Sequence, residues 1–237
     1  MLFPIGDDQV QGGYYPRFSY GLIAFCILFF FIQAQFKDWL VCSLGVVPNQ
    51  ITHGRDLYTL ISSIFLHANL QHLVGNMLFL WVFADNVEAN INSKRFLLFF
   101  FAGGAVAALA HGFVQADAAT DWCCAFCNGG CETVYCQGSV PMIGASGAIS
   151  AVLGSYLVMF PLSRIRVLFL LFSFRVPAFV FLIFWILLQL NNGLSTMGGE
   201  ETNVAWWAHI GGFAFGLLAG VYFRNLSEFI GLGESEV

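Results

Sequence analysis

The sequence predicts an all-α protein that crosses a membrane several times, with residues 1–237 forming a single domain. The first observation is composition: 58% of the 237 residues are hydrophobic and 10% are charged, against about 25% charged residues in an ordinary soluble domain. The second is a series of six apolar runs, most of them close to the length of a membrane-spanning helix. The third is a strong asymmetry of basic residues between the two sides of those runs.

Composition and charge also exclude several classes of protein. The mean hydropathy of +0.76 and the 27 Phe residues rule out a soluble globular enzyme and a disordered chain. The net charge is −5 and the isoelectric point is near 5.4, so the chain has no basic stripe for phosphate backbones. The expected surroundings are a lipid bilayer, nucleic acid is excluded as a partner, and the oligomeric state stays open.

The first expected span covers residues 18–36 and lies between Arg17 and Lys37. It is not a signal peptide, because Asp7 and Asp8 stand where a basic segment is required and further spans follow. The other spans follow from the same need for about 20 mostly apolar residues, and they cover residues 70–89, 96–114, 145–160, 178–190 and 205–223.

Two connections have unusual composition. The segment 38–66 is too apolar for a hydrated linker, and its aromatic and aliphatic side chains favour a position in the membrane interface. The fifth span is short if it begins after Pro177, so residues 167–174 either extend it or lie along the interface.

Basic residues set the orientation, because cytoplasmic loops retain Lys and Arg. With six spans, one side holds only Lys37 and Arg55, whereas the other holds seven basic residues: Arg17, Lys94, Arg95, Arg164, Arg166, Arg175 and Arg224. We therefore expect both termini in the cytoplasm. The segments 37–69, 115–142 and 191–204 then face outward.

Three polar motifs lie in or beside the spans, where polar groups are costly. The first places His67 before the second span, with His72 and Asn76 on one face of that helix because they are four residues apart. On its own, this pattern favours interhelical hydrogen bonds that hold the bundle together.

The second motif, Gly144-Ala-Ser146-Gly147, opens the fourth span. A serine at a helix start usually serves as a cap. It can also act as a nucleophile, because backbone N–H groups of a first helical turn lack intrahelical partners and can stabilise an oxyanion. The motif differs from the Gly-x-Ser-x-Gly elbow of soluble hydrolases, because Ala148 stands where the second glycine would be.

The third motif places His209 in the sixth span, on the same helical face as a series of glycines. The fourth span carries a matching stripe of small residues, and such stripes let helix backbones approach closely in lipid. Packing the two stripes together would bring Ser146 and His209 into hydrogen-bond reach near the outer surface. The residues of the two stripes are Gly212, Gly216 and Gly220, and Gly147, Ser150, Ala151 and Gly154.

Together the motifs predict acyl transfer by a serine nucleophile and a histidine base. No Asp or Glu lies in a span at this depth, so the sequence favours a Ser146/His209 dyad over a triad. The expected chemistry needs no cofactor.

This combination of motifs, with six helices and cytoplasmic termini, resembles the rhomboid intramembrane serine proteases over most of the chain. The resemblance implies that Ser146 attacks the scissile carbonyl and that His209 is the general base. It implies that His72, Asn76 and the backbone N–H of Ser146 form the oxyanion hole. His67 would be structural, as would the glycines near the site, Gly144, Gly147, Gly212 and Gly216.

The residues between Tyr156 and Gln189 resemble bacterial-type members, and we expect a bacterial plasma membrane protein, in line with the small size and lack of appended domains. Two features depart from the family pattern. The first outer loop reads Asp-Leu-Tyr-Thr at 56–59 where many members carry Trp-Arg. Some members place a tyrosine four residues after the nucleophile, packed on the catalytic histidine. Here Ser150 stands there, so the base is either held less firmly or held by another ring such as Trp206 or Trp207.

The segment 115–140 forms a cysteine-rich outer loop. Five cysteines there can form disulfides, bind zinc through four thiolates, or stay free: Cys123, Cys124, Cys127, Cys131 and Cys136. An odd number leaves one cysteine over, with Cys42 as a possible partner elsewhere. We expect the loop to limit substrate entry.

The sequence thus predicts an intramembrane serine endopeptidase that cleaves transmembrane proteins near the outer membrane face. One alternative is a catalytically silent rhomboid-like protein that binds membrane helices; the presence of both the serine and the histidine argues against it. A second alternative is a transporter or a metal or redox membrane protein. That reading expects charged or Cys residues deep in the spans, where only Cys26 clearly lies.

Overall fold

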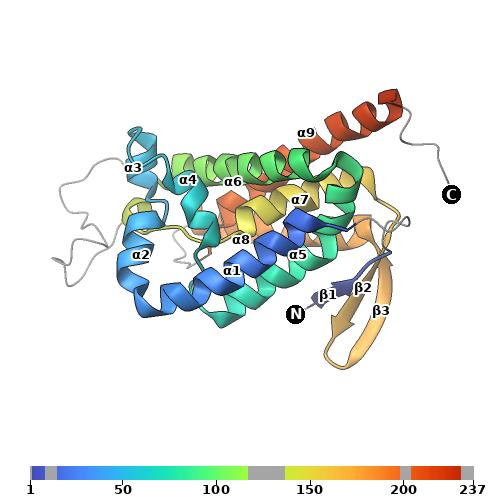
Figure 1. The fold of residues 1–237 in the computed structure, drawn as a ribbon, viewed down its shortest axis with the longest axis horizontal. Coiled ribbons are helices and arrows are strands. Elements are labelled where there is room, and N and C mark those ends of the chain that lie inside the picture. Colours follow the sequence, from blue (N-terminus) through green and yellow to red (C-terminus); the bar gives the residue numbers. More distant parts are fainter. Residues whose placement is uncertain (1, 9–14, 117–136, 198–203, 231–237) are drawn as a thin grey trace.

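The computed structural model describes residues 2–8, 15–116, 137–197 and 204–230, and within them the long helices pack as a bundle (Figure 1). The fold is the helical bundle of a polytopic membrane protein, which confirms the predicted class. The helices with 14 residues or more in these ranges are α1 (Arg17–Gln35), α5 (Leu70–Ile91), α6 (Ser93–Gln115), α7 (Ser146–Met159), α8 (Ala178–Met197) and α9 (Trp206–Ile230).

Four of these helices, α1, α6, α8 and α9, are long and apolar enough to cross a membrane. The α7 helix is apolar but has 14 residues. The count of six spans therefore stays a prediction. The fifth long helix, α8, continues to Met197, beyond the end of the apolar run expected at 178–190.

Short helices occupy the end of the bundle where α7 begins (Figure 1). Trp39, Leu57 and Tyr58 are exposed along this segment, as expected for a segment in the membrane interface. The elements are α2 (Lys37–Leu44), α3 (Pro48–Thr52), α4 (Thr59–Ser62), η1 (Ser63–Phe65) and η3 (Gln137–Ser139).

A small antiparallel sheet lies at the opposite end (Figure 1). Its strands are β1 (Leu2–Gly6), β2 (Arg164–Phe169) and β3 (Phe172–Pro177), in that order. Residues 167–174 thus form part of a β-hairpin and do not extend α8. Alternating β-branched and aromatic residues favour strands here, and Leu170 adopts a positive φ of 54° in the turn.

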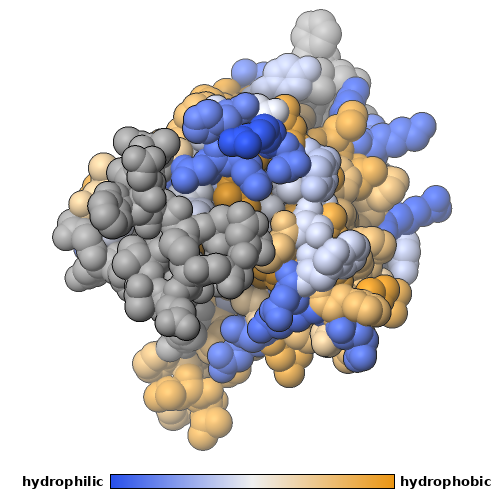
Figure 2. All heavy atoms as spheres, turned by 90° about the vertical axis from the view of Figure 1, so that its left-hand side faces the viewer, coloured by the Kyte–Doolittle hydropathy of each residue, from blue (hydrophilic) through white to orange (hydrophobic). Residues whose placement is uncertain are grey.

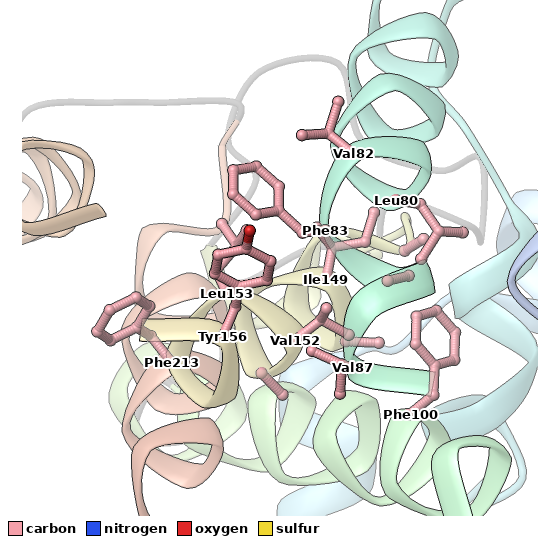
Figure 3. Packing of buried hydrophobic residues seen from close by; sticks show 14 of the residues in the cluster. Leu80, Val82, Phe83, Val87, Phe100, Ile149, Val152, Leu153, Tyr156 and Phe213 are labelled. Carbon is pink, nitrogen blue, oxygen red and sulfur yellow. The ribbon is translucent and has the colours of Figure 1, made fainter. Parts of the chain in front are cut away.

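The core is centred on α7, where every residue from Gly147 to Tyr156 is buried. The α7 helix packs against α5, α6 and α9. Figure 3 shows large side chains of α5, such as Phe83, meeting Leu153 and Tyr156 of α7. A helix buried on all sides must be apolar all round, and this explains why α7 has no polar face.

Glycines let α7 and α9 approach closely. A Cβ on Gly212 would lie 2.2 Å from the Gly147 carbonyl oxygen, and one on Gly216 would lie 2.0 Å from that of Ala151. On α7, a Cβ on Gly154 would lie 2.2 Å from the Phe213 carbonyl oxygen. Any side chain at these positions would force the two backbones apart.

Glu88 is buried near the sheet end of α5, and it caps α1. Its carboxylate accepts hydrogen bonds from the Ser19 N–H (2.8 Å) and hydroxyl (2.6 Å), and from the Phe18 N–H (3.1 Å). A carboxylate is favourable beside the first turn of a helix. Glu88 thus has a structural role, so its buried charge does not by itself indicate a transporter.

Candidate active site

Ser146 is the first residue of α7, and His209 lies near the start of α9. The Ser146 hydroxyl and the His209 Nε2 atom are 2.9 Å apart, within hydrogen-bond distance. The glycine contacts between α7 and α9 set this distance, because they fix how closely the two helices approach. The structure therefore brings together two residues that lie 63 positions apart in the sequence.

Gln189 of α8 holds the other side of the imidazole. Its Oε1 atom lies 2.9 Å from His209 Nδ1, and its amide nitrogen donates to the Trp185 carbonyl oxygen at 3.1 Å. The second bond fixes which end of the amide faces the histidine, so Nδ1–H donates to Oε1. The Nε2 atom is then unprotonated and can accept the Ser146 hydroxyl proton.

From the sequence, Gln189 is noted only within the resemblance, and no third polar residue is expected beside the histidine. The signal was present, because a buried amide inside an apolar helix is costly unless it has a specific partner. The absence of Asp and Glu from the spans at this depth therefore does not exclude a third member, because Gln189 takes that place.

Two indole rings flank the histidine. The Trp185 and Trp206 rings each lie 6.0 Å from the His209 ring, the first tilted and the second edge-on. Trp206 is one of the two rings that the sequence suggested. Ser150, which replaces the tyrosine of some family members, instead donates to the Ser146 carbonyl oxygen at 2.6 Å.

His72 and Asn76 of α5 lie beside Gly144, two residues before Ser146. A Cβ on Gly144 would be 2.8 Å from His72 Nε2 and 3.6 Å from Asn76 Nδ2. Gly144 also has a φ of +125°, which favours glycine. The absence of a side chain thus leaves space for both nitrogen atoms next to the start of α7.

Both nitrogen atoms carry hydrogens that can be donated. The Ala68 N–H donates to His72 Nδ1 at 3.3 Å, so the proton of the neutral ring is on Nε2. The Asn76 Nδ2 atom is buried and donates to no atom in the described part of the chain. An unused buried donor beside a nucleophile is suited to an oxyanion, and the half-buried His72 ring presents its Nε2–H next to it.

His67 lies outside the helices and contacts both α1 and the His72 ring. Gln33 of α1 accepts from its N–H and donates to its carbonyl oxygen, each at 2.9 Å. The His67 ring packs edge-on against the His72 ring, with ring centres 5.3 Å apart. Burial lowers the pKa of His67 to about 4, so its ring is neutral at physiological pH.

The five loop cysteines, from Cys123 to Cys136, lie outside the described residues, so the choice among disulfides, zinc and free thiols stays open. Cys42 in α2 is disulfide-bonded.

Figure 2 shows the end of the molecule that carries α2 and α3, where many hydrophilic residues gather. The site therefore lies towards an end of the bundle that can meet water.

Taken together, the described side chains supply a hydroxyl nucleophile, a neutral imidazole base with a fixed tautomer, and two donors for an oxyanion. Nucleophilic acyl transfer requires these three roles.

Comparisons with known proteins identify relatives over most of the chain. A family model described as "Rhomboid domain" matches residues 54–226. "RHOMBOID-like protein 12, mitochondrial" of Arabidopsis thaliana is 30% identical over 80% of this chain and 53% of its own length. "Rhomboid protease GluP" of Bacillus subtilis is 28% identical over 60% of this chain and 24% of its own. The chain thus spans about half or less of the length of these relatives.

Proposed function

The chain belongs to the rhomboid family, and from that premise we propose that it is an intramembrane serine endopeptidase with transmembrane proteins as substrates. The observation that carries the proposal is the hydrogen-bonded series Ser146–His209–Gln189, with 2.9 Å at each step. Gln189 fixes the tautomer in which the imidazole can act as a base. The name of the Bacillus subtilis relative supports the same activity.

In the proposed reaction, His209 Nε2 removes the Ser146 hydroxyl proton while the oxygen attacks the scissile carbonyl carbon. The proton then passes to the leaving amine, and an acyl-enzyme remains. A water molecule from the polar end of the bundle attacks the acyl carbon, with His209 again as base, and releases Ser146. The Gln189 oxygen stabilises the imidazolium that forms in each step.

The developing oxyanion would accept hydrogen bonds from His72 Nε2, Asn76 Nδ2 and the Ser146 backbone N–H. Two of these groups already lie beside Gly144, and Asn76 Nδ2 has no described partner to leave. Donors that are in place before the reaction need no reorganisation at the transition state.

The substrate would be a transmembrane helix that unwinds at the polar end and presents an extended segment to Ser146. The carbonyl groups of an intact helix are hydrogen-bonded and shielded, so unwinding must come first. We propose that this end faces outward and that both termini are cytoplasmic. The distribution of basic residues and the disulfide at Cys42, which is typical of oxidising compartments, support this orientation.

We propose the bacterial plasma membrane as the location, which the relative from Bacillus subtilis supports. Another relative carries a mitochondrial name. Fractionation of the source cells, followed by detection of the chain in the separated membranes, distinguishes a bacterial plasma membrane from a mitochondrial membrane.

A covalent probe for activated serines tests the proposal without knowledge of the substrate. We expect a fluorophosphonate to label the wild-type protein and the Ser155→Ala variant but not Ser146→Ala. Ser155 is a matched control, because it is a buried serine of the same helix whose hydroxyl donates to the Val152 carbonyl oxygen at 2.9 Å and which lies away from His209 along α7. Absence of labelling in all three proteins would favour a silent membrane-helix-binding relative.

A further inference from the structure

We propose that the β2–β3 hairpin is a membrane anchor that lies in the leaflet at the sheet end of the bundle. Its apolar face would contact acyl chains, and Arg166 and Arg175 would bind the phosphate groups of anionic lipids. This inference is independent of the proteolytic activity.

The free end of the hairpin is strongly apolar and exposed. Leu171 is 93% exposed, and Leu170 and Phe172 are 75% and 74% exposed. Figure 1 shows the hairpin projecting sideways from the end of the bundle, away from the helices. A run of large apolar side chains in water favours aggregation, so this end needs an apolar environment.

The register of the two strands separates an apolar face from a basic face. Residues on a strand alternate between faces, and directly paired residues share one. One face carries Ile165, Val167, Phe169, Phe172, Phe174 and Val176, and the other carries Arg164, Arg166, Arg175 and Ser173 together with Leu168 and Pro177. All three arginines of the hairpin thus lie on one face and none on the other, an amphipathic arrangement typical of an interfacial membrane element.

The apolar face extends from the bundle core to the exposed end of the hairpin. Near the bundle, Ile165 and Val167 on this face are buried against the core. The same face continues into the projecting half, where nothing described covers Phe172. The helix α8 starts directly after β3, and its first turns also expose large apolar side chains, among them Phe179 and Phe184. The hairpin surface is thus continuous with that of a candidate membrane-spanning helix.

The basic face carries a pair of like charges. Arg166 and Arg175 lie directly opposite each other in the register, and both are exposed. Among the residues described here, neither forms an ion pair with a carboxylate. Like charges in this position destabilise a sheet unless an anion lies between them. A lipid phosphate fits, because guanidinium groups bind phosphate with two parallel hydrogen bonds and the membrane surface supplies phosphates at this depth.

Fluorescence of two labelled variants tests the anchor. Phe172→Cys and Ser173→Cys place a thiol on adjacent residues of opposite faces, and a nitrobenzoxadiazole maleimide attached there reports its surroundings. Wild-type protein treated with the same reagent gives the background, and helical content by circular dichroism verifies folding. The proteins are reconstituted in phosphatidylcholine vesicles with or without phosphatidylglycerol.

We expect aqueous iodide to quench the label at position 172 several-fold less than the label at 173, and doxyl-labelled lipid to quench it more strongly. Equal quenching of both labels by iodide would overturn the anchor. A second outcome would also overturn the anchor: the label at 172 is shielded from both quenchers, and iodide reaches it again when the protein is diluted into excess lipid. A second copy of the chain, and not lipid, would then cover this face.

The arginine contribution is tested in the Phe172→Cys background. Phosphatidylglycerol should increase the protection of the label from iodide, and the added substitutions Arg166→Gln and Arg175→Gln should abolish that increase. If the increase persists without the two guanidinium groups, these residues do not bind the lipid phosphate.

Discussion

At the scale of single residues, the proposed base depends on an amide where many serine hydrolases use a carboxylate. A glutamine oxygen can accept the Nδ1 proton of His209 and fix the tautomer without placing a charge inside an apolar bundle. A buried carboxylate would carry a large desolvation cost there. An amide therefore fits this environment better than the Asp or Glu that a catalytic triad would suggest.

Replacement of Gln189 should slow the reaction without removing it. We expect Gln189→Leu to lower kcat by about 10- to 100-fold, because the base stays in place but loses its orientation, whereas general-base catalysis as a whole contributes about 10²–10⁴-fold. Gln189→Glu also offers an acceptor to Nδ1, but its buried carboxylate carries a desolvation cost and cannot donate to the Trp185 carbonyl oxygen, so it should recover only part of the loss. Kinetics on a single-span substrate measure both variants, and equal kcat for wild type and Gln189→Leu would contradict the assigned role.

Asn76 makes a separate contribution at the oxyanion. We expect Asn76→Ala to reduce turnover by about 10²–10³-fold, the usual effect of one lost donor, with little change in substrate binding. Labelling of Ser146 by a fluorophosphonate under saturating conditions should persist, because the nucleophile and base are intact. Undiminished turnover in Asn76→Ala would remove this residue from the oxyanion hole.

At the scale of elements, the glycines of α9 decide the geometry of the site. We expect Gly216→Ala to destabilise the protein by about 1–3 kcal/mol, because its methyl group would meet backbone atoms of Ala151 that cannot move aside. The separation of α7 and α9 should also slow cleavage. Gly21→Ala in α1 is the control, because no atom lies within 4 Å of its added Cβ. Thermal unfolding compares the two, and an unchanged midpoint in Gly216→Ala would refute the close packing.

The helices could be predicted from the sequence more accurately than the strands. Each long helix begins within three residues of its expected span, because long apolar runs are a strong signal. The β-hairpin was harder to predict, since residues 164–177 are short, apolar and flanked by helices. A helical extension and a strand fit such a run equally well until cross-strand pairing is known. The meeting of α5 with Gly144 likewise depends on tertiary packing, and no local pattern reports it.

At the scale of the whole molecule, Asp7 connects the N-terminal strand to the bundle. Its carboxylate accepts hydrogen bonds from the Tyr156 hydroxyl and from the Asn86 side-chain amide. Burial, together with the nearby Asp85 and Asp8, raises the pKa of Asp7 to about 7, against an ordinary value of 3.8. The folded protein therefore holds a proton on Asp7 that the unfolded chain releases.

Stability should consequently fall as the pH rises from about 4 to about 7, because the folded state binds more protons than the unfolded state in this window. Asp7→Asn keeps an oxygen acceptor for both hydrogen bonds but does not titrate. We expect its unfolding temperature to depend less on pH than that of the wild type. Parallel pH curves for the two proteins would show that Asp7 does not titrate near neutrality.

The measurement that most directly tests the central claim is cleavage of a single-span substrate by the purified protein in liposomes. Wild type and the Ser155→Ala control should yield the same two fragments, and Ser146→Ala should yield none. Mass spectrometry of the fragments should place the cut near the membrane surface at the end of the bundle that carries α2 and α3. Cleavage by Ser146→Ala at the wild-type rate would contradict the assignment of this serine as the nucleophile.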